Sequence, residues 1–240
     1  MKDEARERAR KRLILALDVP DLAAGADLLD RVEGQVGMVK VGLEIFTACG
    51  PAAVEAVKSR GYGVFLDLKL HDIPATVAGA VRSARGLGVS MLTVHTGGGE
   101  AMLAEAVAAA DGALVILGVT LLTSLSSADL PPVGIIGEPA EIVRLRASLA
   151  ARMGCSGLVC SPQEVRGVRA AVGPKVTLVT PGIRPAGAET GDQKRAATPG
   201  AAIADGADYL VVGRPIRDAA SPAAAARGIV EEIMRAMPVP

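Results

Sequence analysis

The stretch GVFLDLKLHDIPATV, residues 63 to 77, contains a nearly continuous apolar run that ends in charged residues. Such a run is typical of a parallel strand that other elements cover. Asp67, Lys69 and Asp72 lie within six residues at the end of this run. Charges brought together at a strand end are costly unless each has a partner. The stretch therefore predicts a buried strand that delivers a charge cluster to a site.

Runs of the same kind recur along the chain, and the sequence predicts eight strands in total. Segments with helical spacing, such as Leu22, Ala26, Leu29 and Val32, lie between them. This alternation in 240 residues favours an α/β fold, a closed (β/α)8 TIM barrel with parallel strands, over an open doubly wound sheet. No linker divides the chain, so we expect residues 1–240 to form a single barrel domain. The other runs are LILALD from Leu13, VGMVKVG from Val36, VSMLTVH from Val89, ALVILGVT from Ala113, SGLVCS from Ser156, KVTLVTP from Lys175 and ADYLVVG from Ala207.

Two helix starts and one long insertion stand out between the strands. Ser161-Pro162-Gln163-Glu164 has the residues of a capping box, and Ser221-Pro222 has an N-cap serine before proline. Each pattern predicts a helix that begins at its proline. The polar and proline-containing segment 124–139 is either a lid or a variable surface loop.

Polar residues interrupt the predicted strands mainly at their C-terminal ends, where active sites of such barrels gather. Lys40, Asp67 and Lys69 come from adjacent strands, and their alternating signs would let each charge offset the desolvation of its neighbour. A purely structural ion cluster is the alternative interpretation. The other residues at this rim are Asp18, His95, Thr120, Thr123, Pro181, Gly182, Arg184, Gly213 and Arg214.

The segments after the seventh and eighth strands are rich in glycine and cationic residues. These segments are TPGIRPAGAETGDQKR, residues 180–195, and VVGRPI, residues 211–216. Glycine lets the backbone approach an anion closely, and arginine offers a two-pronged donor to phosphate oxygens. Because barrels of this kind often bind phosphate after strands seven and eight, the two segments predict a phosphate site rather than an ordinary exposed loop.

Composition excludes several other classes of function. Lys plus Arg and Asp plus Glu both total 26, and the chain has two Phe, two Tyr and no Trp, which argues against nucleic-acid binding. Cys49, Cys155 and Cys160 lack metal-ligand spacing and fit small buried residues of a reducing compartment. His71 and His95 share no short metal-ligand spacing either. With neither a secretory signal nor an apolar run long enough to span a membrane, we expect a cytoplasmic protein with no metal site.

Short blocks along the chain, taken in their order and spacing, carry a specific resemblance. They are LALD at 15–18, VKVGLEIF at 39–46, FLDLKLHDIPATV at 65–77, TVHTGGG at 93–99, GVTLLTS at 118–124, VTPGIR at 179–184, DQKRAATP at 192–199 and VVGRPI at 211–216. Together they resemble the orotidine 5'-monophosphate decarboxylases, in particular the bacterial branch. The resemblance implies decarboxylation of orotidine 5'-monophosphate to uridine 5'-monophosphate, the last step of de novo pyrimidine synthesis, without metal or organic cofactor.

The resemblance also implies roles for individual residues. Lys40, Asp67, Lys69 and Asp72 would form the catalytic charge network, with Lys69 as the proton donor to C6 of the pyrimidine. A homodimer is implied, in which Asp72, Ile73 and Thr76 reach the site of the partner subunit. The implied substrate-binding residues are Asp18, Lys40 and Thr76 for the ribose, Thr123 and Ser124 for the pyrimidine and its loop, Pro181 near the base, and Arg184, Gln193, Gly213 and Arg214 for the 5'-phosphate.

Two alternatives remain beside this interpretation. The chain is also similar to magnesium-dependent sugar-phosphate decarboxylases and aldolases of the same superfamily, which share the DxKxxD pattern of the third strand. Those enzymes need an acidic residue near the end of strand two, where this chain has Lys40, whose ammonium would repel the metal. The second alternative is a non-catalytic phosphate-binding barrel, which would have no need for all four charges.

Overall fold

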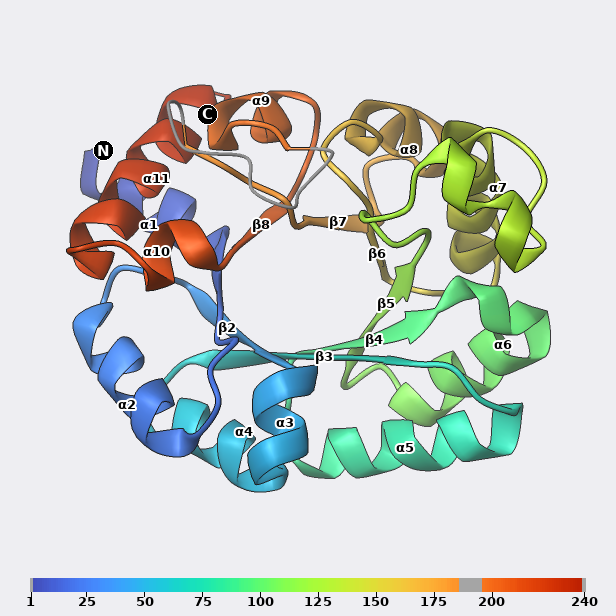
Figure 1. Ribbon diagram of the computed structural model, residues 1–240, viewed down its shortest axis with the longest axis horizontal. Coiled ribbons are helices and arrows are strands. Elements are labelled where there is room, and N and C mark those ends of the chain that lie inside the picture. Colours follow the sequence, from blue (N-terminus) through green and yellow to red (C-terminus); the bar gives the residue numbers. More distant parts are fainter. Residues whose placement is uncertain (1, 186–195, 239–240) are drawn as a thin grey trace.

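The computed structural model describes residues 2–185 and 196–238, and in these residues eight parallel strands close into a barrel in sequence order (Figure 1). Each strand lies within the run that predicted it, and the closed order of the parallel strands confirms the predicted barrel. Continuous apolar runs form such strands because both faces of the barrel wall are covered. The strands are β1 (Leu13–Ala16), β2 (Met38–Gly42), β3 (Gly63–Leu70), β4 (Met91–His95), β5 (Val115–Val119), β6 (Gly157–Val159), β7 (Thr177–Thr180) and β8 (Tyr209–Val212).

Helices surround the barrel and connect consecutive strands (Figure 1). No helix in the two described ranges is both long and apolar enough to traverse a lipid bilayer. The α-helices are α1 (Lys2–Lys11), α2 (Leu22–Arg31), α3 (Leu43–Cys49), α4 (Pro51–Lys58), α5 (Pro74–Gly86), α6 (Gly99–Ala110), α7 (Pro139–Arg152), α8 (Val165–Val172), α9 (Pro199–Ala204), α10 (Arg214–Arg217) and α11 (Pro222–Ala236), and the 3-10 turns are η1 (Thr96–Gly98), η2 (Ser127–Asp129) and η3 (Pro131–Val133).

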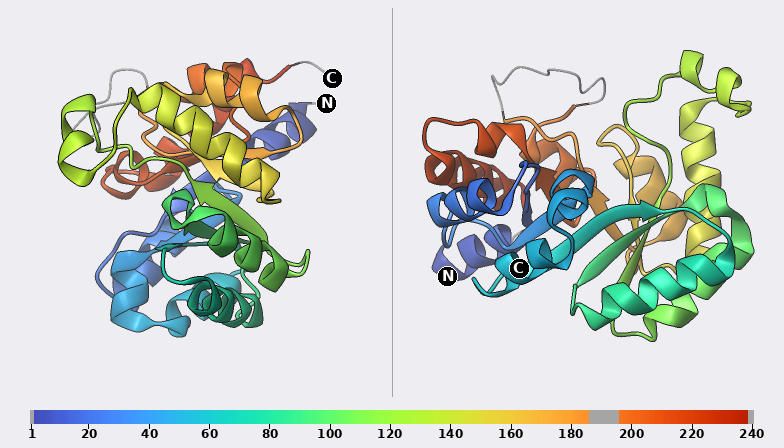
Figure 2. Two further views of the ribbon diagram at one scale, coloured as in Figure 1. Left: turned by 90° about the vertical axis from the view of Figure 1, so that its right-hand side faces the viewer. Right: turned by 60° about the horizontal axis from the view of Figure 1, so that its bottom comes forward.

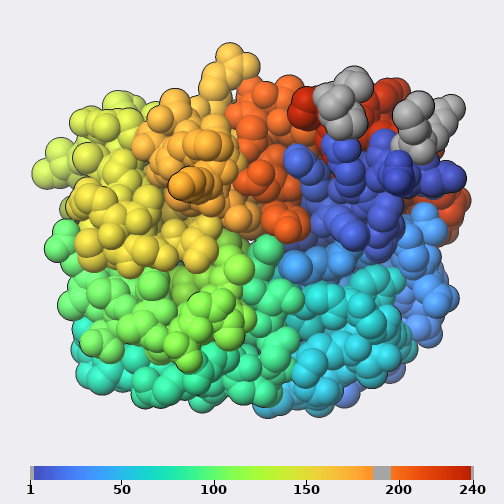
Figure 3. All heavy atoms as spheres, turned by 180° about the vertical axis from the view of Figure 1, so that it is seen from behind, coloured from blue at the N-terminus to red at the C-terminus, as the bar shows by residue number. Residues whose placement is uncertain are grey.

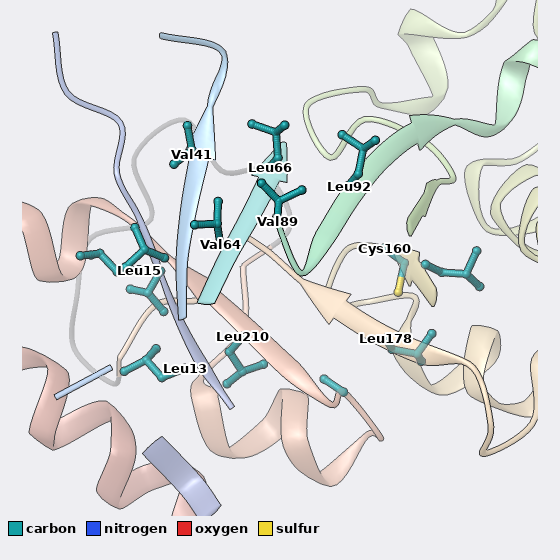
Figure 4. Packing of buried hydrophobic residues seen from close by; sticks show 14 of the residues in the cluster. Leu13, Leu15, Val41, Val64, Leu66, Val89, Leu92, Cys160, Leu178 and Leu210 are labelled. Carbon is teal, nitrogen blue, oxygen red and sulfur yellow. The ribbon is translucent and has the colours of Figure 1, made fainter. Parts of the chain in front are cut away.

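Alternate residues of each strand build two separate apolar cores. Side chains that point into the barrel, among them Phe65 and Leu117, form one cluster. Their neighbours along the strands, such as Leu15 and Leu66, point outward and pack beneath the helices (Figure 4). Cys160 is fully buried in this outer layer, as expected for a structural cysteine. The inner core fills the barrel below the C-terminal ends of the strands, and the polar residues lie at that C-terminal rim.

The first and last helices, α1 and α11, meet on one side of the barrel. Helix α1 packs against α11, so that the first and last segments lie side by side (Figure 3). In α1, Arg10 donates to the backbone oxygen of Val36 and pairs with Glu7, which anchors the helix beside β2. Helix α1, which holds most of the charged N-terminal residues, therefore forms part of the barrel's helical cover.

The structure corrects one predicted helix start and confirms the other. Helix α8 begins at Val165, three residues after the predicted proline, because residues 161–164 form a turn in which the Ser161 hydroxyl has no hydrogen-bond partner. Only the reverse half of the capping box forms, since the Glu164 carboxylate accepts the Ser161 N–H at 3.0 Å. Helix α11 begins at Pro222 with Ser221 as its N-cap, as predicted. The insertion 124–139 contains η2 and η3 and stands out from the barrel (Figure 2).

Candidate active site

A cavity of about 510 Å³ opens at the C-terminal ends of the strands, where the sequence places its polar residues. Apolar residues of the inner core form its floor, and charged residues from several strand ends form its walls. The lining residues are Ala16, Asp18, Lys40, Phe65, Asp67, Lys69, Val119, Leu121, Leu122, Thr123, Val159, Pro181, Gly182, Arg184, Val211, Gly213, Arg214 and Arg217.

Lys40 joins two carboxylates across neighbouring strand ends. Its ammonium lies 2.8 Å from Asp18 Oδ1 and 3.7 Å from Asp67 Oδ2. Its side chain is only 11% exposed, so the charge is largely withdrawn from water. A buried ammonium is tolerated when carboxylates surround it. Lys40 therefore lies beside Asp67, as the sequence predicted, and it also pairs with Asp18 in the segment after β1.

Asp67 is the central acceptor of the cluster. Lys69 Nζ lies 2.9 Å from each Asp67 carboxylate oxygen, and the Thr93 hydroxyl donates to Oδ1 at 2.9 Å. Burial alone would raise the pKa of Asp67, but the charges of Lys40 and Lys69 and the two hydrogen-bond donors outweigh it, and the pKa lies below its ordinary value. The carboxylate is thus held ionised inside the cavity.

The backbone at Lys69 is unusual for a residue with a side chain. Its φ is +50°, and the pairing of β3 with β4 shifts register between Leu66 and Leu70. At this break the Lys69 N–H donates to the Thr93 hydroxyl at 2.8 Å instead of to a backbone oxygen. Such strain persists only where its surroundings enforce it and often marks functional sites.

Thr93 is a site residue that the sequence analysis did not single out. It is fully buried and contacts both Asp67 and the backbone of Lys69. The signal was present in the block TVH at the end of β4, because Thr93 precedes His95 by two residues and so shares its inward face. A search for polar residues at the inward-facing positions of apolar strands would have identified Thr93.

Arg217 is a second residue that the sequence analysis missed. It lies one turn beyond Arg214 on α10, just after the block VVGRPI, and it lines the cavity. Its Nη1 donates to the backbone oxygen of Asp18 at 2.7 Å, while Nε and Nη2 grip the carboxylate of Asp218 at 2.6 and 3.1 Å. The hydrogen bond with Asp218 raises the pKa of Arg217, and the charges of Asp18 and Glu44 act in the same direction.

The residues predicted for phosphate and pyrimidine binding are brought together only in part. Arg184, Gly213 and Arg214 lie in one wall of the cavity, and Pro181 and Thr123 also line it. Ser124 is exposed and does not line the cavity. Gln193 lies outside the described residues, as do Lys194 and Arg195.

Asp72, Ile73 and Thr76 lie apart from the cavity of their own chain. All three are exposed and none lines the cavity, although Asp72 follows Lys69 by only three residues. The Asp72 carboxylate accepts the Ile73 N–H at 2.6 Å, and the Ile73 side chain is 66% exposed. Within one chain, Asp72 therefore does not join the other charges.

The two histidines stack beside the strand ends. The rings of His71 and His95 have centroids 5.1 Å apart and an interplanar angle of 15°. His95 Nδ1 accepts the N–H of Gly97 at 3.1 Å. Burial, together with the electrostatic effect of nearby His71, Arg146 and Lys69, lowers the pKa of His95 to about 4. The pair links the turn after β3 to the end of β4.

Comparisons with known proteins agree with this geometry. A relative from Moorella thermoacetica named orotidine 5'-phosphate decarboxylase is 53% identical over 97% of this chain and 96% of its own length. A relative of the same name from Anaeromyxobacter sp. (strain K) is 56% identical over 91% of this chain and 96% of its own. The crystal structure of orotidine 5'-phosphate decarboxylase from Lactobacillus acidophilus superimposes with a TM-score of 0.82 at 34% identity and covers 92% of this chain and 98% of that one. A family model matches residues 11–229, and the chain therefore belongs to the orotidine 5'-phosphate decarboxylase / HUMPS family.

Proposed function

We propose that this chain decarboxylates orotidine 5'-monophosphate to uridine 5'-monophosphate and carbon dioxide, the last step of de novo UMP biosynthesis. The names of the relatives that match nearly the whole chain support the activity. The observation that carries the proposal is the row of alternating charges Asp18, Lys40, Asp67 and Lys69 in one cavity. We further propose that the chain works in the cytoplasm, as a single domain and without metal or organic cofactor.

The proposed chemistry needs a cation where negative charge develops. When the bond from C6 to the carboxylate breaks, its electron pair remains on C6 and carbon dioxide leaves. Lys69 then transfers a proton from its ammonium to C6, and solvent returns a proton to the amine. A fixed ammonium in a water-poor site stabilises such charge far more than water does.

Asp67 has two roles in this proposal. Its contacts to both Lys69 and Lys40 hold the two ammonium groups in place. Facing the carboxylate of the substrate, it would also raise the energy of the bound ground state. Enzymes lower barriers by about 8 to 23 kcal/mol, whereas an exposed ion pair contributes about 0 to 1 kcal/mol. The burial of Lys40 and Asp67 at the centre of this cluster is therefore essential to the proposal.

The rest of the cavity fits a nucleotide. Asp18 and Lys40 would bind ribose hydroxyls, Thr123 and Pro181 would lie near the pyrimidine, and Ser124, which does not line the cavity, would belong to the loop beside the base. Arg184, Gly213 and Arg214 would bind the 5'-phosphate together with Gln193. Binding energy from this non-reacting phosphate can organise the catalytic charges, which is how remote contacts accelerate a reaction.

A homodimer is part of the proposal. Asp72 would complete the charge network of the partner subunit, with Ile73 and Thr76 beside it and Thr76 at the partner's ribose. The support is that all three residues are exposed and outside the cavity of their own chain. An exposed isoleucine next to an exposed aspartate fits a surface that a second copy covers.

The magnesium-dependent sugar-phosphate enzymes remain the alternative. They need an acidic residue near the end of strand two to help hold the metal, and this chain has Lys40 there. In this chain the Lys40 ammonium already lies between Asp18 and Asp67. A second cation at that position would be repelled, which favours the nucleotide substrate.

The test is to mix purified protein with orotidine 5'-monophosphate in excess EDTA and follow both the orotate absorbance and carbon dioxide release. We expect turnover that Lys69→Ala abolishes and Lys175→Ala leaves unchanged, because Lys175 is exposed at the opposite end of the barrel, before β7. If the protein does not turn over orotidine 5'-monophosphate but becomes active when magnesium and a keto-sugar phosphate are added, the proposal is overturned in favour of the alternative.

A further inference from the structure

We propose that Arg217 is a positioning residue that fixes Asp18 and thereby sets how tightly the substrate ribose is bound. This inference rests on the proposed function, because the role of Asp18 toward ribose is part of it. Arg217 would act through the backbone of Asp18 rather than through the reacting atoms.

The guanidinium of Arg217 holds two partners at once. Nε and Nη2 grip the two carboxylate oxygens of Asp218, and this leaves Nη1 directed at the backbone oxygen of Asp18, 2.7 Å away. A planar guanidinium held on one side by a bidentate pair has few orientations left. Asp218 therefore orients Arg217, and Arg217 connects the segment after β1 to α10 across 199 residues of sequence.

Asp18 is a partly exposed residue that lines the cavity. It lies in the segment between β1 and α2, and its side chain is 41% exposed. Its carboxylate has glycines on two sides, since a Cβ on Gly42 would lie 2.9 Å from Oδ1 and one on Gly213 would lie 3.8 Å from Oδ2. The space around the carboxylate is thus left to Lys40 and to a ligand. The backbone tether from Arg217 holds the carboxylate in place without occupying that space.

The tether also links two proposed binding positions. The Arg217 N–H donates to the backbone oxygen of Gly213 at 2.9 Å, within the turn proposed for phosphate. The same residue reaches Asp18, proposed for ribose. The side chain and the backbone N–H of Arg217 therefore fix the distance between Gly213, proposed for phosphate binding, and Asp18, proposed for ribose binding.

A double-mutant cycle on catalysis tests this inference. Asp18→Ala, Arg217→Ala and the double variant are compared with the unchanged chain for kcat and KM on orotidine 5'-monophosphate. If Arg217 acts through Asp18, Arg217→Ala lowers kcat/KM on the order of tenfold in the unchanged background and has little effect once Asp18 is alanine. The loss appears mainly as a higher KM, as expected for a contact made equally in ground and transition states.

Arg166→Ala is the matched control. Arg166 grips Asp205 through Nε at 3.0 Å and Nη2 at 2.6 Å, but on an exposed surface outside the cavity. Its removal breaks another arginine–aspartate pair, in which both nitrogens donate to one oxygen, Asp205 Oδ1, and should change neither kcat nor KM. Asp218→Asn is the second variant if Arg217→Ala does not fold, because it keeps the arginine but loses the carboxylate that aims it. We expect Asp218→Asn to raise KM less than Arg217→Ala does. We also expect Arg217→Lys, which cannot form the same two-pronged pair, not to restore the KM of the unchanged chain.

The outcomes separate this inference from the proposed function. The inference alone would be overturned if the unchanged chain is active but Arg217→Ala lowers kcat/KM by the same factor with Asp18 and with Asp18→Ala. A KM that neither Arg217→Ala nor Asp218→Asn alters would do the same. Absence of turnover by the unchanged chain would overturn the proposed function and the inference with it.

Discussion

At the residue scale, the site depends on charges that alternate in sign. Lys40 lies between the carboxylates of Asp18 and Asp67, and Asp67 lies between the ammonium groups of Lys40 and Lys69. Each buried charge thus has a neighbour that offsets its desolvation. The positive φ of Lys69 fits this arrangement, because the register shift beside it frees its N–H for Thr93.

Thr93 should tune the protonation of Asp67. Thr93→Val removes a hydrogen bond that favours the ionised carboxylate, so the pKa of Asp67 rises toward its ordinary value. Because the proposed mechanism needs Asp67 ionised, the acid limb of the kcat/KM profile should move to higher pH. The pH profile of the two proteins measures this shift.

Thr96→Val is the control for Thr93→Val. The buried Thr96 hydroxyl donates to the backbone oxygen of Val119 at 2.8 Å, so its loss also costs about 1 kcal/mol of stability. It does not contact Asp67. An acid limb that moves equally in both variants would show that Thr93 acts on stability and not on Asp67.

At the element scale, the strands could be predicted because each one is a short apolar run, and the parallel arrangement followed from the helical segments between them. The start of α8 could not be predicted in this way. The capping-box residues at 161–164 form a turn, and the hydroxyl of Ser161 is buried there without a hydrogen-bond partner. Sequence patterns record which side chains can cap a helix. They do not record whether the chain direction after β6 lets them do so.

The tight contact between β5 and β6 can be tested at Gly157. A Cβ at this position would lie 2.5 Å from Leu117 Cδ2 and 2.9 Å from the backbone oxygen of Thr177. Gly157→Ala should therefore lower the free energy of unfolding by about 1 to 3 kcal/mol through overpacking. Gly167→Ala is the control, because this α8 position is open and alanine should stabilise the helix by about 0.5 to 1 kcal/mol. Urea unfolding of both variants checks the prediction, and equal stabilities would contradict it.

The stacked histidines at the ends of β3 and β4 predict a pH dependence of stability. Burial beside His71, Arg146 and Lys69 lowers the pKa of folded His95 to about 4, so the unfolded chain binds a proton at higher pH than the folded chain does. The free energy of unfolding should then fall as the pH drops from about 6.5 to about 4. In His95→Asn this slope should be shallower. Thermal unfolding midpoints across that range measure it, and parallel curves would refute the assignment.

At the scale of the whole molecule, the barrel explains why so much of the site could be predicted. Residues at the ends of separate strands converge because parallel strands end at one rim, which placed Asp18, Lys40, Asp67 and Lys69 together before their distances were known. Thr93 and Arg217 were missed because their contacts depend on a register shift and on a helical turn. Asp72 belongs to neither group, since a single chain does not bring it to the cavity.

The proposed dimer makes a prediction that only two chains together can fulfil. Lys69→Ala and Asp72→Asn subunits should each form inactive homodimers. In a hybrid dimer, one site combines an intact Lys69 with an intact partner Asp72, while the other site carries both changes. Random exchange between equal amounts makes half of the dimers hybrid, so about a quarter of the original activity should return. Activity is measured after co-refolding the two variants.

The control for this experiment pairs Lys69→Ala with Asp67→Asn. Both residues belong to the cavity of one chain, where their side chains are 2.9 Å apart, so every site in a hybrid dimer keeps one defect. No activity should return in this mixture. Recovery with Asp72→Asn but not with Asp67→Asn would place Asp72 in the partner's site. Failure of both mixtures, with dimers present, would mean that Asp72 serves its own chain and that the turn carrying it moves toward Lys69 when substrate binds.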